Sequence, residues 1–426
     1  MFKRKNIYLD HAGATPIIDK EISRKVNFSG RKFFANPSAI YSGGVEARNQ
    51  IESARNKIAK LINAHNDEII FTGSGTESDA LAILGVINNY KLISKNEKLE
   101  YKVPHIITTQ IEHPAVLENC KMLQNWGRAE VTYVSVDKNG IINLEEFEES
   151  LKDNTVLVSI MYANNEIGTI QPIEEIAKII RRYRKRKRAS EGIPLGFLEA
   201  KSFLALLPVF HTDACQAMNY LPTENIEKLG VDLMTFNSSK IYGPKGVGVL
   251  YKKRNVELSP LYMGGGQEFK LRPGTESVAL IMGCALALEK VNKIKKREIE
   301  RLTKIRNYGI RKLLSLSESS GYKIILNGDT EKRLPNNINI SIRGISSELL
   351  VIELSAKGIF VSEKSACKSD SDDKSYVIKA IRKICPKDGK EEGSLRISLG
   401  RGNMMSDMDV LYKELKKILE KYSKWN

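Results

Sequence analysis

Lys240, Asp213 and His113 are the residues whose types and positions could do chemistry together. Each comes at or just after the end of an apolar segment: Lys240 follows DLMTFNSS, Asp213 ends PVFHTD, and His113 follows PHIITTQIE. Ligands bind in open α/β sheets beyond the carboxyl ends of the strands, so we expect the three side chains to meet there. A lysine among hydroxyl groups has a lowered pKa and can form an imine, whereas a buried carboxylate requires a cationic partner.

A glycine-containing turn, Gly73-Ser74-Gly75-Thr76, joins the apolar segment EIIFT to a helical pattern. Main-chain amides at the start of such a helix would face outward and bind a phosphate group. A dinucleotide fingerprint would need a third glycine where Ser78 stands, and the phosphate-loop pattern GxxxxGK[ST] is absent. Taken alone, the turn is also compatible with a plain connection between a strand and a helix.

Polar side chains follow two further apolar segments: Asn165 comes after VSIMYAN, and Gln216 after HTDAC. Pyridoxal 5'-phosphate requires a lysine, an acid facing its ring nitrogen, a planar group stacked on the ring and an anion-binding helix start. Lys240, Asp213, His113 and the glycine turn are candidates for these four parts. Singly, Lys240 could be a surface lysine and His113 a structural histidine, but the combination favours a pyridoxal phosphate site and predicts no metal centre.

The elements that would position these residues form an alternating pattern of helices and short strands, which predicts an α/β fold with a three-layer, mainly parallel sheet. Most predicted strands are apolar at successive positions, as a sheet covered on both faces requires. We expect a large domain over residues 17–295, with an insertion at about 189–208, and a smaller α+β domain from residues 1–16 and 296–426. Helices are expected at 46–62, 76–90, 114–127, 277–318 and 407–422, and strands at 67–73, 104–110, 131–136, 155–163, 208–214, 232–237, 246–252, 337–342 and 395–400.

Length and composition indicate a globular protein. With 426 residues, 42% of them hydrophobic, the chain can bury a large core. It has no apolar run of membrane-spanning length and no signal-peptide pattern, so we expect a cytoplasmic protein without membrane insertion. The five cysteines lack metal-ligand spacing, which indicates reduced thiols.

Most of the net charge of +16 is spread along the chain, and the exception is the basic run RRYRKRKR at residues 181–188. This run continues a helical pattern that begins near Ile173. A solvated helix end is our first interpretation, and an acidic or RNA partner is the alternative. Direct nucleic-acid binding is not expected.

In these residues and in the motifs around them, the chain resembles the cysteine desulfurases. These are pyridoxal-phosphate enzymes of aminotransferase class V that supply sulfur for iron-sulfur clusters and thiolated tRNA. The resemblance covers nearly the whole chain except the insertion. It implies fold type I of the pyridoxal-phosphate-dependent transferases, a homodimer, and a sulfur-acceptor protein such as an iron-sulfur scaffold or a tRNA-thiolation enzyme. The motifs occur in the family's order: YLDHAGATP, NPSAIYSGG, FTGSGTESDALAI, IEHPAVL, NNEIGTIQPI, HTDACQA, DLMTFNSSKIYGPKGVGVLY, GGGQEFKLRPGTES, SACKS and LRISLGR.

The resemblance implies a role for each matching residue. Lys240 resembles the Schiff-base lysine, Asp213 the partner of the ring nitrogen, and His113 the stacking residue, which could also shuttle a proton. Arg396 resembles the clamp for the substrate carboxylate, for which a planar guanidinium is suited; an ordinary ion pair is the alternative. The other cofactor contacts implied are Asn165 (also a substrate contact), Gln216, Gly75, Thr76, Asn237, Ser238, Ser239 and, toward the neighbouring subunit, Thr275.

Cys367 matches the family's persulfide-forming cysteine, in a loop expected to be mobile at about 362–375. The resemblance therefore implies that L-cysteine is converted to L-alanine while its sulfur passes to Cys367 and then to an acceptor. Neighbouring Lys364 and Lys368 would favour the thiolate.

The chain departs from the family pattern at Ser239, where histidine is usual, which puts cofactor affinity and rate in question. Other interpretations stay open. A selenocysteine lyase or another class V enzyme would use the same cofactor. A degenerate, non-catalytic scaffold or RNA-binding protein is the alternative from another class.

Overall fold

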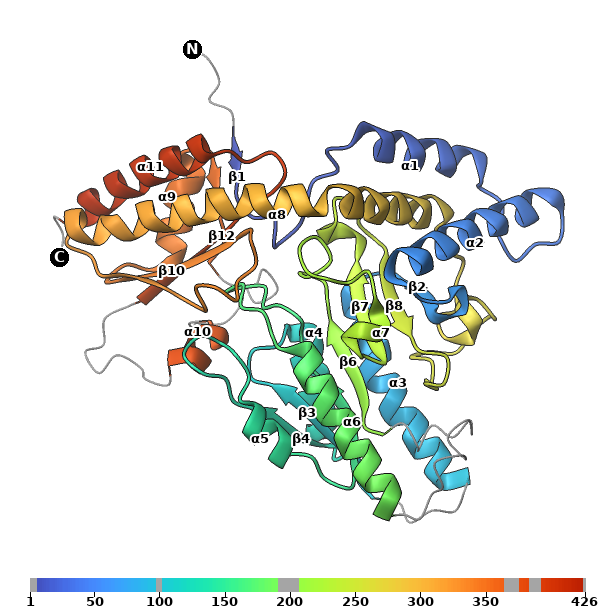
Figure 1. Ribbon diagram of the computed structural model, residues 1–426. Helices are drawn as coiled ribbons and strands as arrows, with labels where there is room; N and C mark the ends of the chain where they lie inside the picture. The colour runs from blue at the N-terminus through green and yellow to red at the C-terminus, as the bar shows by residue number, and fades with distance from the viewer. Residues whose placement is uncertain (1–5, 97–101, 191–206, 364–374, 383–391, 424–426) are drawn as a thin grey trace.

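The larger part of the molecule is built on a seven-stranded sheet in the order β2-β8-β7-β6-β5-β3-β4 (Figure 1). The computed structural model describes residues 6–96, 102–190, 207–363, 375–382 and 392–423. β8 runs antiparallel to both of its neighbours, and the other pairs in this sheet are parallel. The strands are β2 (Ile69–Thr72), β3 (His105–Thr109), β4 (Glu130–Val134), β5 (Thr155–Ser159), β6 (Val209–Asp213), β7 (Leu233–Asn237) and β8 (Gly248–Lys252).

Successive residues of these strands pack into two different apolar cores, one on each face of the sheet. In β7, Leu233 belongs to one core, and Met234 and Phe236 belong to the other. In β3, Ile106 and Ile107 divide in the same way. Both faces are therefore covered, which is why the strands are apolar at successive positions. The predicted three-layer α/β class is confirmed.

Helices cover the sheet and connect its strands (Figure 1). α3 begins at Gly75 directly after β2, and α4 begins at Pro114 shortly after β3. The sequence patterns did not predict α1, α5 and α7 in this part, nor α9 (Ser347–Ala356) and α10 (Tyr376–Arg382) in the smaller part. The helices of this part are α1 (Lys20–Lys32), α2 (Ser42–Ile62), α3 (Gly75–Asn96), α4 (Pro114–Asn125), α5 (Leu144–Glu149), α6 (Ile173–Ser190) and α7 (Ile226–Leu229).

The basic run at 181–188 lies in the second half of α6, as the helical pattern indicated. Part of the run is used in contacts with the rest of the fold. Arg184 pairs with the buried Asp232, and Arg182 and Arg186 both pair with Glu148, at 3.3 and 3.2 Å. These pairs anchor the end of the helix to the sheet and to α5.

A smaller antiparallel sheet, β12-β10-β9, lies beside the large one together with the short parallel pair β1-β11 (Figure 1). The long helix α8 runs along both parts, so the domain boundary expected at residue 295 falls inside it. The elements of this part are β1 (Ile7–Tyr8), α8 (Val278–Ser320), β9 (Ile324–Leu326), β10 (Asn337–Arg343), α9 (Ser347–Ala356), β11 (Ile359–Phe360), α10 (Tyr376–Arg382), β12 (Glu392–Ser398) and α11 (Met405–Ser423).

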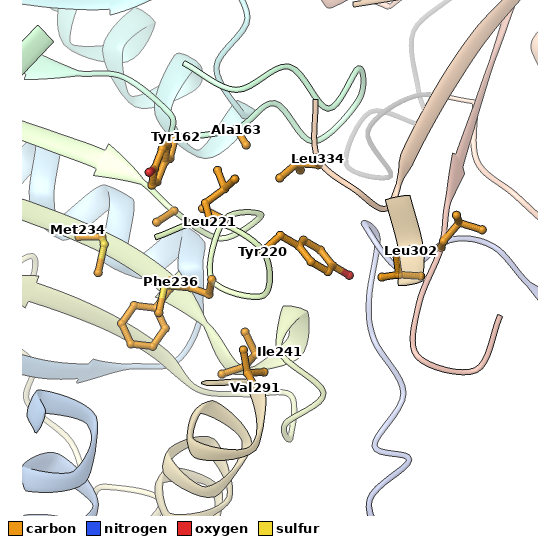
Figure 2. Close-up of a cluster of buried hydrophobic side chains, with 14 of the residues drawn as sticks. Tyr162, Ala163, Tyr220, Leu221, Met234, Phe236, Ile241, Val291, Leu302 and Leu334 are labelled. Atoms are coloured by element: carbon orange, nitrogen blue, oxygen red, sulfur yellow. The ribbon is translucent and has the colours of Figure 1, made fainter. Parts of the chain in front are cut away.

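One apolar core continues from the large sheet toward the smaller part. Figure 2 shows Met234 and Phe236 of β7 near Tyr220 and Leu221, with Val291 of α8 packed below them. Leu302 of α8 and Leu334 belong to the same core on the other side. This shared packing holds the two sheets in a fixed relation around the site described next. Among the described helices, none has both the length and the apolarity that crossing a membrane requires.

Candidate active site

A cavity of about 250 Å³ lies at the carboxyl ends of the central strands. It is formed where β3, β5, β6 and β7 end, at the start of α3, and against β12. The structure brings ten of the sequence-predicted residues into its lining: Gly75, Thr76, His113, Asn165, Asp213, Gln216, Asn237, Ser239, Lys240 and Arg396. The remaining lining residues are Ala12, Gly13, Ser74, Asp79, Met161 and Cys215.

Lys240 reaches this cavity from a single 3₁₀ turn, Ser238–Lys240, that follows β7. Asn237 caps the turn, because its Oδ1 accepts hydrogen bonds from the Lys240 amide at 3.1 Å and from the Ser239 hydroxyl at 2.9 Å. The Lys240 Nζ donates to the carbonyl oxygen of Ala12 at 2.8 Å and also to that of Gly13. The amine is thus held at the cavity wall by main-chain acceptors.

His113 is the N-cap of α4, and its Nδ1 accepts a hydrogen bond from the Ala115 amide at 3.1 Å. Burial lowers the pKa of the imidazole, and the charges of Lys240 and Arg396 act in the same direction, whereas Asp213 opposes them. The ring is therefore neutral at neutral pH, with its proton on Nε2.

Asp213 ends β6, and its Oδ1 accepts a hydrogen bond from the Cys215 amide at 2.8 Å. A second carboxyl group, Asp79, lies in the same lining. Burial raises the pKa of Asp79 well above its usual range, and repulsion from Asp213 raises it further. Burial and this repulsion therefore both favour the protonated form of Asp79.

The start of α3 forms another wall of the cavity. The first amides of a helix have no partner within the helix, so those of Gly75 and Thr76 are available to an anion. Gly75 has to be glycine here, since a Cβ at this position would stand 2.8 Å from Asn237 Nδ2 and 2.9 Å from Cys215 Sγ. This close approach lets the helix end reach the cavity.

Arg396 enters the cavity from β12, the strand of the smaller sheet. Its side chain is only 1% exposed, and its Nη2 donates to Asp10 Oδ1 at 2.9 Å. Its Nη1 donates to the carbonyl oxygen of Asn165 at 3.3 Å. A buried guanidinium at the rim of a cavity is able to bind a carboxylate in two-point contact.

Of the predicted site residues that the structure describes, two are not in the lining, Ser238 and Thr275. Ser238 is fully buried beside it. Thr275 is exposed in the segment before α8, and Cys367 lies outside the described residues. Their roles stay predictions.

Sequence reasoning missed Asp79, Cys215, Met161 and the main chain of Ala12 and Gly13. Ala12 and Gly13 belong to YLDHAGATP, a motif that contributes to the resemblance without implying a role for either residue. For these two residues the motif was the only signal in the sequence, because a main-chain carbonyl acceptor is present in every residue type.

The fold and this site are those of an enzyme of the class V aminotransferase type. The chain belongs to the aminotransferase class-V family, whose family model matches residues 7–186 and 207–411. The unmatched stretch overlaps the insertion expected at about 189–208.

Among curated proteins, the chain is similar to a protein named "Cysteine desulfurase IscS" from Dictyoglomus turgidum, with 40% identity over 98% of this chain and 95% of that protein. It is also similar to "Cysteine desulfurase IscS 1" of Archaeoglobus fulgidus, with 37% identity over 97% of each chain. The resemblance inferred from the motifs is thereby confirmed.

Solved structures agree with this assignment. A "NifS-like protein" superposes with a TM-score of 0.82 at 32% identity, covering 98% of this chain and 100% of the other. A structure described as "SspA in complex with cysteine" superposes with a TM-score of 0.68 at 30% identity, covering 92% of this chain and 98% of the other.

Proposed function

We propose that this protein is a cysteine desulfurase, which converts L-cysteine to L-alanine and transfers the sulfur to its own Cys367. The observation that carries the proposal is the convergence of Lys240, Asp213, His113 and Arg396 on one cavity. This set supplies an amine, an anion, a neutral imidazole and a carboxylate-binding cation within the same space. Similarity to proteins named cysteine desulfurase over nearly the full length supports the same reaction.

The residues present fit pyridoxal 5'-phosphate as the cofactor. Oδ1 of Asn165 is buried at the cavity and has no hydrogen-bond partner among the described residues, so it awaits a donor or a bridging water. The start of α3 is a cradle that a Cβ at Gly75 would fill. Asp213 would hold the ring nitrogen protonated, Lys240 would hold the aldehyde carbon, and the amides of Gly75 and Thr76 would hold the phosphate. When bound, the cofactor supplies an electron sink for the carbon that loses its proton.

The side chains of this protein would divide the remaining work between them. Arg396 holds the substrate carboxylate and fixes the orientation of the amino acid. Lys240, once its amine is free, takes the α-proton at Nζ. His113 exchanges a proton at Nε2 with the substrate thiol or with the departing product.

Sulfur transfer would take place at Cys367. Its thiolate attacks the sulfur of the bound substrate, so that an S–S bond forms and the C–S bond breaks, with the electron pair remaining on the substrate carbon. Proton uptake at that carbon gives L-alanine. The balance is one L-cysteine and one protein thiol giving one L-alanine and one protein persulfide.

Assembly and sulfur delivery complete the proposal. Thr275 is exposed and does not line its own cavity, which is compatible with a contact to the phosphate site of a second copy in a homodimer. The persulfide would pass to an acceptor protein for iron-sulfur cluster assembly or tRNA thiolation in the cytoplasm.

The test compares sulfide and alanine release from L-cysteine, with dithiothreitol as reductant, for the wild type, Lys240→Ala and Cys367→Ala. We expect both variants to release no sulfide above background, with Cys367→Ala retaining the visible absorbance of the bound cofactor. Normal sulfide release by Cys367→Ala would contradict the persulfide step. A wild type without bound cofactor or sulfide release would favour a non-catalytic scaffold, and faster turnover of selenocysteine than cysteine would favour a lyase.

A further inference from the structure

Asp10 and Arg396 form an ion pair that joins the amino-terminal segment to the smaller sheet. The Arg396 guanidinium is fixed at both of its outer nitrogens, since Nη2 donates to Asp10 Oδ1 at 2.9 Å and Nη1 donates to the carbonyl oxygen of Asn165 at 3.3 Å. Its Nε is buried and has no hydrogen-bond partner among the described residues. The two acceptors therefore fix the plane of the guanidinium. The remaining N–H groups of Arg396, including Nε–H, can still donate hydrogen bonds to a ligand.

Asp10 is itself held in place by the turn that follows it. Its carbonyl oxygen accepts hydrogen bonds from the Tyr8 hydroxyl at 3.0 Å and from the Gly13 amide at 3.1 Å. One carboxylate oxygen, Oδ2, packs against Gly13 so closely that a Cβ there would stand 2.5 Å from it. Asp10 thus presents its other oxygen, Oδ1, to Arg396 from a fixed backbone.

The carboxylate of Asp10 is not part of the cavity lining, whereas Arg396 is. A ligand in the cavity would therefore meet the guanidinium without having to displace Asp10. A guanidinium has five N–H donors, so it can keep the contacts to Asp10 and Asn165 and still offer others to a carboxylate. Arg396 can therefore bind Asp10 and a ligand carboxylate at the same time, so the two do not compete for it.

We propose that Asp10 is a positioning residue that orients Arg396 for the carboxylate of the amino-acid substrate. The inference rests on the proposed function insofar as it takes an amino acid to be the substrate. The residue acts by accepting a hydrogen bond, and its negative charge is secondary. A purely structural carboxylate, present only to neutralise a buried cation, would act through its charge instead.

The experiment uses the cofactor-loaded enzyme and the variants Asp10→Ala and Asp10→Asn. Asparagine keeps an acceptor oxygen but has no charge, and alanine has neither. Asp67→Ala serves as the control, because Asp67 also pairs with an arginine, Arg254, at 2.8 Å, and neither residue lines the cavity. KM and kcat for L-cysteine are measured by sulfide release, and Kd values for L-alanine and L-alaninamide by calorimetry.

For Asp10→Ala we expect KM for L-cysteine and Kd for L-alanine to rise about tenfold, with kcat within about twofold, as loss of one oriented hydrogen bond to a charged group implies. Asp10→Asn should stay within about threefold of the wild type on the same scale. The Kd for L-alaninamide, which has no carboxylate, should not change in either variant. Asp67→Ala should match the wild type throughout.

The proposal is overturned if Asp10→Asn is as impaired as Asp10→Ala, or if both ligands weaken equally. If Asp10→Ala does not fold, Asp10→Asn still tests the proposal. A role based on charge predicts a large rise in KM and Kd for Asp10→Asn, whereas a role as hydrogen-bond acceptor predicts a small one. A wild type that binds L-alanine in an Asp10-dependent way but releases no sulfide would refute the desulfurase activity and leave the positioning role intact. A wild type that releases sulfide, while Asp10→Ala keeps the wild-type KM and Kd values, refutes the positioning role alone.

Discussion

The Nδ1 atom of His113 accepts a hydrogen bond from the main-chain amide of Ala115 at 3.1 Å, so the imidazole caps the first turn of α4. An amide can only donate, and Nδ1 is therefore unprotonated. In the neutral ring the proton is on Nε2. The same contact that begins the helix thus selects the tautomer at the cavity, and Nε2 is the nitrogen that can exchange a proton with a bound molecule.

His113→Asn is expected to fold normally, because an asparagine oxygen can accept the same amide as an N-cap. It should nevertheless lose sulfide release by about 10²-fold or more, since its side chain cannot transfer a proton. Burial lowers the pKa of His113. We therefore expect no acid-side break in the wild-type kcat/KM profile at the ordinary histidine value of 6.5; the break from this ring should come at lower pH.

The check is a pH–rate profile of the wild type together with thermal denaturation of His113→Asn. Equal activity of the two proteins would show that the ring transfers no proton. A break at the ordinary histidine pKa would contradict the effect of burial.

Gly75→Ala is expected to weaken binding of pyridoxal phosphate by about tenfold or more, because the added methyl group meets Asn237 and Cys215 and moves the helix start away from the phosphate. The measurement is the Kd of the cofactor from absorbance titration of the apoprotein. Gly402→Ala is the matched control, since an added Cβ there has no neighbour within 4 Å. Equal affinities of the two variants would contradict the assignment of the helix start as the phosphate site.

Asn237→Ala removes the cap of the turn that carries Lys240, whereas Asn237→Asp keeps an acceptor for the Lys240 amide at the same place. We expect the alanine variant to lose about 1 kcal/mol of unfolding free energy, as loss of a helix cap does. It should also lose more kcat than the aspartate variant, because the lysine is no longer held in position. Denaturant titration and sulfide release measure the two effects, and identical kcat values for both variants would contradict the positioning by Asn237.

Glu112→Gln tests a buried carboxyl group next to His113. Burial raises the pKa of Glu112 from 4.5 to about 8, although hydrogen bonds from Thr109 and the Met161 amide oppose the rise. The folded state therefore keeps a proton that the unfolded state releases above pH 4.5, and the wild type loses stability as pH rises from there to about 8.

Glutamine mimics the protonated side chain and does not titrate, so Glu112→Gln should gain stability relative to the wild type across that window, by roughly 2–4 kcal/mol at about pH 9. The unfolding free-energy difference between the two proteins, measured from pH 5 to 9, checks this. The buried histidines His11, His105 and His211 have lowered pKa values in both proteins. Their contribution to the pH dependence of the unfolding free energy therefore cancels in the difference. A difference that does not vary with pH would contradict a raised pKa.

Much of the site could be inferred from residue order, because parallel strands place their carboxyl ends at one edge of a sheet. His113, Asn165, Asp213 and Lys240 each follow an apolar strand, and each lines the cavity. The alternation of helix and strand patterns likewise predicted the sheet. α5, α7, α9 and α10 were missed because each has only four to ten residues, so its helical state depends on packing against the rest of the chain. The 13-residue helix α1 was also missed.

The order of residues along the chain was enough to establish which residue types stand at the strand ends, and thus the cofactor chemistry that the cavity suits. Folding in three dimensions was needed to bring Asp10 to Arg396 across 386 positions of the chain and the Ala12 and Gly13 carbonyls to the amine of Lys240. The physical reason is that strand and helix patterns are local and repeat at fixed periods. Contacts between distant segments depend on how complete elements pack, and main-chain acceptors have no residue type by which a sequence could reveal them.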